Sequence, residues 1–183
     1  MYVYGCNTIF TTSMKNRSDK EMIWAFSELT KNLKSHGIKA GFHIMDNGES
    51  TALNMTINSM KIKYQQVPPS NHRENNSEIA IQTFKNHFIA GMCSIDKDFH
   101  IQLWDRLLKQ ATIRLNLLRQ SGTLPHLSAY THTFEEIDYN FTLLAPPGTR
   151  VVIHNKPNDC ASWSPHGKDG CYIGPEMEGY RWY

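Results

Sequence analysis

Gly41-Phe42-His43-Ile44-Met45-Asp46-Asn47-Gly48 is the stretch of sequence that decides the fold. Its first five residues form the short apolar run that is typical of a buried strand, and Asp46 stands where that strand would end. A second acid, Glu78, lies in the first turn of a strongly patterned helix predicted over residues 77–92. In sheets built from strand–helix crossovers, functional side chains gather at strand ends and at nearby helix starts. Asp46 and Glu78 both occupy such positions.

On both sides of this stretch, predicted strands and helices alternate. An S-x-x-E pattern beginning at Ser18 indicates a capping box, in which Ser18 and Glu21 satisfy the first amides of a helix. Alternation of strands with helices predicts an α/β domain with parallel crossovers and helical faces. The predicted elements are a strand within residues 1–10, a helix over 18–37, a strand over 41–45, a helix over 51–60, a strand over 61–67, and helices over 77–92, 98–118 and within 124–133.

The composition is typical of a globular protein with one ordinary domain and a small appendage. Of the 183 residues 40% are apolar and 20% charged, and a net charge of +2 is too small to argue for nucleic acid by itself. The four cysteines are scattered without metal-binding spacing, which argues against a zinc module or a disulfide framework. No apolar run reaches the roughly 18 residues that a membrane span needs. We therefore expect an intracellular protein, nuclear or cytoplasmic, without a membrane segment.

The composition shifts at Ala145-Pro146-Pro147-Gly148. Beyond this point two short strands, over residues 150–154 and 171–174, are separated by Pro, Asn, Gly and Asp. We expect an α/β domain over residues 1–144 and a small β-rich segment over residues 145–183.

Taken singly, both acids have ordinary structural interpretations. An Asp before Asn-Gly is usually a turn residue, and a Glu in the first turn of a helix suits the helix dipole. The chemical alternative is a site for phosphoryl transfer on a nucleic acid. That reaction uses two divalent cations held by a few carboxylates on strand ends and helices.

The residues around the two acids favour the chemical alternative. Met45-Asp46-Asn47-Gly48, then a strand, then the polar stretch from Pro68 to Glu78 resembles the integrase catalytic core of retrotransposons, particularly the copia type. In that family a D-N-G turn supplies the second acid, and a long helix carries the third. The tail is similar to the segment that follows the core in copia-type polyproteins, in the order Val152-Ile153-His154, Trp163 to Gly167, Gly170 to Pro175 and Gly179-Tyr180-Arg181.

The resemblance implies a ribonuclease H-like mixed sheet flanked by helices, DNA strand transfer, and Mg²⁺ or Mn²⁺ as cofactor. It also implies DNA as a partner and allows a homo-oligomer. Asp46 and Glu78 become the catalytic and metal-binding residues. The residues expected to contact nucleic acid are His72, Arg73, Gln82 and Lys85. For His72 and Arg73, a solvated polar turn is an equal alternative.

The sequence departs from the family pattern at the first acid, which belongs on the first strand. Val3 stands there, and no acid occurs before Asp19, so the metal site lacks one carboxylate and strand transfer is predicted to be lost. Ile79 and Gln82 replace arginines beside Glu78, which weakens phosphate contact. The resemblance therefore implies a truncated and degraded retroelement integrase. The alternative is a non-enzymatic relic that binds nucleic acid or protein and retains only the fold.

Other residues favour structural roles. His126 and His132 have no convergent carboxylate or cysteine nearby in the sequence, so we do not expect them to bind metal. Cys93 is expected to be a buried apolar residue. The aromatic residues of the tail, among them Trp163 and Tyr172, are expected to supply core area, although they could also stack on bases.

Overall fold

The structure is a computed structural model that describes residues 1–45, 50–67, 76–140, 142, 144–156, 158 and 160–175. It is mixed α/β and divides into two compact units. The first comprises Met1–Phe84 with Asn116–Glu136, and the second Lys85–Leu115 with Ile137–Tyr183. The predicted boundary between residues 144 and 145 falls inside the second unit, and the division into domains at that point stays a prediction.

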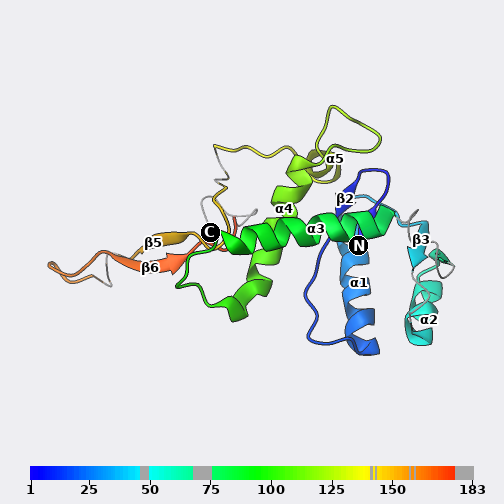
Figure 1. Ribbon diagram of the computed structural model, residues 1–183, viewed down its shortest axis with the longest axis horizontal. Helices are drawn as coiled ribbons and strands as arrows, with labels where there is room; N and C mark the ends of the chain where they lie inside the picture. Colours follow the sequence, from blue (N-terminus) through cyan, green and yellow to red (C-terminus); the bar gives the residue numbers. More distant parts are fainter. Residues whose placement is uncertain are drawn as a thin grey trace. The chain divides into compact units, whose positions relative to one another are not determined.

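The first unit contains two pairs of strands and several helices (Figure 1). The strands β1 and β2 pair in antiparallel fashion, whereas β3 and β4 pair in parallel with Phe42 opposite Lys63. The elements are β1 (Tyr2–Val3), β2 (Thr8–Ile9), α1 (Asp19–Ser35), β3 (Phe42–Met45), α2 (Thr51–Ser59), β4 (Lys63–Gln66), the start of α3 (Asn76–Cys93), the end of α4 (Leu108–Leu118) and α5 (Ala129–Thr133). The predicted α/β class is confirmed.

The β3–α2–β4 crossover encloses the main apolar cluster of the first unit. Ile57 of α2 is completely buried, and Met45 at the end of β3 is 3% exposed. They pack with Phe26, Leu53 and Ile62, which come from α1, α2 and the approach to β4. The Ser50 hydroxyl begins α2 by accepting a hydrogen bond from the Leu53 amide at 3.3 Å. This cluster therefore fixes the end of β3, the residue directly before Asp46.

The first ten residues form a hairpin rather than a single strand. Its turn ends at Asn7, which has a left-handed φ of 58°. The buried Asn116 side chain of α4 binds both backbone polar groups of Ile9 in β2. Its Oδ1 accepts from the Ile9 amide at 2.9 Å, and its Nδ2 donates to the Ile9 carbonyl at 2.8 Å. An amide side chain thus takes the place of a neighbouring strand beside β2.

The capping box predicted at Ser18 is wrong. Ser18 does precede α1, but its hydroxyl makes no capping hydrogen bond. The Asn16 side chain already accepts the Ser18 amide proton at 2.9 Å, and Glu21 accepts from the Lys15 amide at 3.3 Å instead. A local turn at Asn16 therefore occupies the donor that the box would have used.

The second unit combines helices with a β-hairpin. The predicted continuous helix over residues 98–118 is wrong in its first part, where a 3₁₀ helix, η2 (Ile101–Leu107), precedes α4 and Leu103 has non-helical angles of −91° and 20°. The predicted strand over residues 150–154 is confirmed as β5 (Arg150–His154). Its partner β6 (Gly167–Cys171) lies earlier than the predicted strand at 171–174.

Two glycines of β6 lie close against the side chains of β5. A Cβ atom on Gly167 would lie 2.5 Å from the Val152 side chain, and one on Gly170 would lie 2.6 Å from that of Ile153. The branched side chains of β5 therefore fill the space that side chains at these two positions would need.

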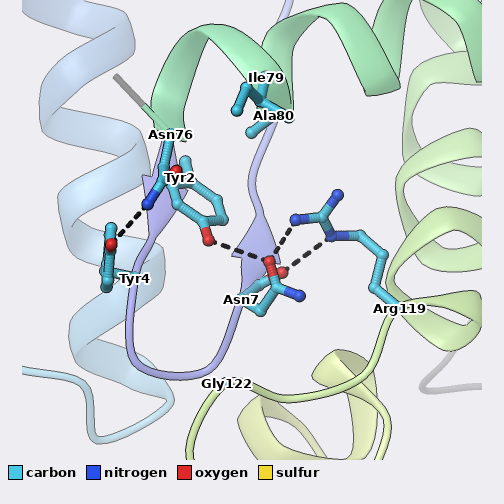
Figure 2. A pocket seen from close by; sticks show the side chains of 8 residues that line it. All are labelled: Tyr2, Tyr4, Asn7, Asn76, Ile79, Ala80, Arg119 and Gly122. Carbon is cyan, nitrogen blue, oxygen red and sulfur yellow. Dashed lines mark hydrogen bonds between the residues drawn. The ribbon is translucent and has the colours of Figure 1, made fainter. Parts of the chain in front are cut away.

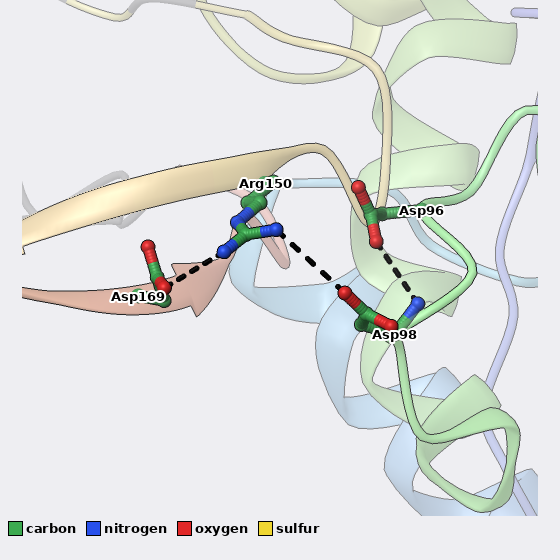
Figure 3. Close-up of polar contacts among 4 residues, drawn as sticks. All are labelled: Asp96, Asp98, Arg150 and Asp169. Atoms are coloured by element: carbon green, nitrogen blue, oxygen red, sulfur yellow. Dashed lines mark hydrogen bonds and ion pairs between the residues drawn. The ribbon is translucent and has the colours of Figure 1, made fainter.

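Exposed ion pairs accompany this hairpin (Figure 3). Arg150 donates to the Asp169 carboxylate at 2.8 Å and lies 3.7 Å from that of Asp98, whose own amide donates to Asp96 at 2.9 Å. The Asp169 hydrogen bond, followed by its charge, raises the pKa of Arg150. Because water and salt screen these exposed charges, the ion pairs add little stability. The carboxylates of Asp98 and Asp169 partly neutralise the positive charge of Arg150.

Candidate nucleic-acid interface

Asp46 lies outside the described residues, but the strand that leads to it is described. β3 ends at Met45, so the predicted strand end directly before Asp46 is confirmed. The ring of His43 packs edge-on against Phe26 with the ring centroids 5.3 Å apart. Burial, followed by the positive charge of the Met1 amino group, lowers the pKa of His43. Burial therefore disfavours the charged form of the histidine in the strand before Asp46.

Glu78 lies in the first turn of α3, as predicted, and is half-buried. This helix begins beside the N-terminal hairpin, because the Asn76 side chain donates a hydrogen bond to the Tyr4 hydroxyl. Asn76, Ile79 and Ala80 line a pocket together with Tyr2 and Tyr4. At about 100° per residue, Glu78 projects from a different side of α3. It does not belong to the described lining of that pocket.

Val3 lies in β1, where it pairs with Thr8, and it is half-buried. Side chains alternate along a strand, so Val3 faces away from its neighbours Tyr2 and Tyr4. Its isopropyl group has no oxygen and cannot bind a divalent cation. The strand expected to carry the first acid therefore lies beside the Glu78 helix without contributing a ligand.

The described residues do not assemble a metal site. Within them, no group of three or more His, Cys, Asp or Glu side chains is close enough to hold an ion. Glu78 is the only residue of the predicted metal-binding pair that falls in the described part. The pairing of Glu78 with Asp46, and the binding of Mg²⁺ or Mn²⁺ between them, stay predictions.

The four predicted nucleic-acid contacts divide into two groups. His72 and Arg73 lie outside the described residues. Gln82 and Lys85 are exposed on α3, four and seven residues after Glu78, which places all three on one side of the helix. Of these three residues, only Lys85 carries a positive charge that can bind a phosphate.

Sequence reasoning missed Arg119, which is half-buried just after α4. Its guanidinium binds the carbonyl and side-chain oxygens of Asn7 and lies 5.8 Å from the centre of the Tyr2 ring. A single arginine past a helix end looks the same in sequence as a solvated one. The predicted structural role of His132 agrees with its contact to the buried Ser121 hydroxyl, 2.6 Å from Nδ1.

Comparisons with known proteins establish a fold and leave the function open. No protein-family model matches the chain, and no curated protein matches its sequence. The structure matches a chain in the cryo-EM structure of the simian T-cell lymphotropic virus intasome in complex with PP2A regulatory subunit B56 gamma, with a TM-score of 0.56 and 15% identity. The match covers 93% of this chain and spans 58% of the length of that chain. The two chains therefore share a fold.

None of the helices in the described part of the chain is both long and apolar enough to cross a membrane.

Proposed function

We propose that this chain is a retroelement integrase-like domain of the ribonuclease H-like superfamily that binds DNA and has lost strand transfer. The observation that carries the proposal is the fold shared with a chain of a retroviral intasome over 93% of this sequence. The order of the Asp46-Asn47-Gly48 motif and the helix that begins near Glu78 supports the proposal independently, because this order is a property of the sequence and does not depend on the shared fold. The copia-type relation and the degraded state belong to this proposal.

Loss of strand transfer follows from the chemistry of the first strand. Two carboxylates, Asp46 and Glu78, can hold at most a weakened divalent site, because the ligand shared between two cations is missing at Val3. We therefore propose that the chain binds Mg²⁺ or Mn²⁺ with lowered affinity. No reaction is assigned to the bound ion. DNA and further copies of the chain are the proposed partners.

DNA binding is tested by fluorescence anisotropy with a labelled double-stranded oligonucleotide over a series of salt concentrations. We expect a Kd on the order of 10⁻⁴ to 10⁻⁶ M near physiological salt, and weaker binding as salt rises, since each phosphate contact releases counterions. Lys85→Gln should make the logarithmic salt slope shallower by about one, and Lys31→Gln, an exposed lysine on α1, is the matched control. Affinity that is undetectable at low salt would contradict the proposal.

An alternative is a relic that binds a protein partner and no longer binds DNA. Exposed apolar side chains on η2 favour it: Ile101 is 61% exposed, Leu103 46% and Trp104 43%. Such surfaces often mark protein contacts. The same titration separates the two functions, because a relic of this kind gives no salt-sensitive DNA complex.

A further inference from the structure

A pocket of about 340 Å³ lies in the first unit, and Glu78 is not among the residues that line it (Figure 2). Its wall brings together residues from the N-terminal hairpin, the first turns of α3 and the segment after α4. The lining residues are Tyr2, Tyr4, Asn7, Asn76, Ile79, Ala80, Arg119 and Gly122. This volume lies near the lower end of the range of small-molecule sites, which suits a ligand the size of one nucleotide.

Arg119 makes the pocket suitable for an anion. Its Nε donates to the Asn7 carbonyl at 3.1 Å and one Nη donates to Asn7 Oδ1, which leaves three of its five N–H groups for a ligand. Tyr2 also holds the Asn7 side chain in place, because its hydroxyl donates to the same Asn7 oxygen at 3.0 Å. No described lining residue is acidic, and no carboxylate in the described chain forms an ion pair with Arg119.

The opposite wall offers flat and apolar surface to the ligand. The Tyr4 ring is 68% exposed and the Ile79 side chain 60% exposed, although both line the pocket. The hydrogen bond from Asn76 to the Tyr4 hydroxyl holds the ring in place, as Figure 2 shows. Exposed rings of this kind stack on bases. The Asn76 amide donates one hydrogen bond to Tyr4, and its oxygen and second N–H can bind a base edge.

We infer that this pocket binds an unpaired nucleotide of a DNA strand, with its phosphate on Arg119 and its base against Tyr4. The inference rests on the proposed function, and it adds a contact that neither Asp46 nor Glu78 provides. A paired base is stacked between its neighbours in the duplex and cannot present its face to Tyr4, so the pocket selects a single strand.

The test compares the anisotropy of a labelled single-stranded oligonucleotide with that of a duplex of the same length. Stacking contributes about 1–3 kcal/mol for each base, so Tyr4→Ala should weaken single-strand binding about 5- to 150-fold and leave duplex binding nearly unchanged. Tyr4→Phe keeps the ring and should retain most of the single-strand affinity. Tyr139→Ala is the matched control, because that tyrosine is 60% exposed and lies outside the pocket.

Arg119→Gln tests the phosphate contact and should make the logarithmic salt slope for the single strand shallower by about 0.7. Arg17→Gln, which changes an exposed arginine, should leave the slope unchanged. Circular dichroism of each variant shows that the fold is kept. If Tyr4→Ala binds the single strand as tightly as the unmodified chain, or loses equal affinity for single strand and duplex, the inference about the pocket is overturned. The proposed function is unaffected by either result. Failure of the unmodified chain to bind either DNA overturns the proposed function as well.

Discussion

Asn116→Leu is expected to lower the free energy of unfolding of the first unit by about 2–5 kcal/mol. Asn116 is 1% exposed, and its amide satisfies both the N–H and the carbonyl of Ile9. Leucine has a similar size but neither donor nor acceptor, so two buried backbone groups of β2 lose their partners. Urea unfolding followed by circular dichroism measures the change.

The control for this variant is Asn32→Leu, which makes the same chemical change at an exposed position of α1. We expect an effect within about 0.5 kcal/mol. If both variants lose similar stability, the amide of Asn116 is not what holds β2, and the position of the hairpin beside α4 needs another explanation.

Ile57→Ala is expected to cost about 2–5 kcal/mol, because it removes a side chain that is completely buried beneath the parallel strands. The vacated space adjoins Met45, so the variant also loosens the strand end that leads to Asp46. The measurement is again urea unfolding, with hydrogen exchange at the β3 amides as a second readout.

Met55→Ala is the matched control, because Met55 lies on the same helix and is 72% exposed. Its expected cost is below about 0.5 kcal/mol. A loss for Ile57→Ala no larger than that for Met55→Ala would contradict the assignment of the apolar cluster to the centre of the first unit.

The parallel strands could be predicted because their signals are local. Residues 41–45 form a short, mostly apolar run, and α2 follows with its own periodicity, so β3 and α2 lie close to where expected. The predicted burial of β3 is wrong, because Phe42 is 55% and Ile44 48% exposed. The α3 helix was predicted for the same reason. The buried side of α3 could not be predicted in the same way, since Ile81 is 66% exposed whereas Ala80 is 2% exposed. Apolar residues occur all around this helix, so periodicity does not single out one side.

The features that sequence did not predict depend on partners far along the chain. Asn116 binds a strand more than a hundred residues away, and nothing in its local sequence indicates that contact. Cys93, expected to be buried, is exposed, and Trp163, expected to supply core area, is 100% exposed, while Tyr172 is buried as predicted. Aromatic content indicates that a small unit needs core area but does not indicate which rings supply it.

The candidate site was predicted only as a set of positions. The sequence placed Glu78 at a helix start and Val3 on the first strand, and both positions are confirmed. Arg119 and the nearby pocket were missed, because they form only when the hairpin, α3 and the segment after α4 come together.

A strand-transfer assay tests the central claim most directly. The purified chain is incubated with a labelled donor duplex, a target DNA and Mg²⁺ or Mn²⁺, and joined products are separated by gel electrophoresis. Since a two-metal site without its first carboxylate cannot support the reaction, we predict a DNA complex without joined product, unchanged in Glu78→Gln. Joined product that appears with metal and disappears in Glu78→Gln would contradict the account.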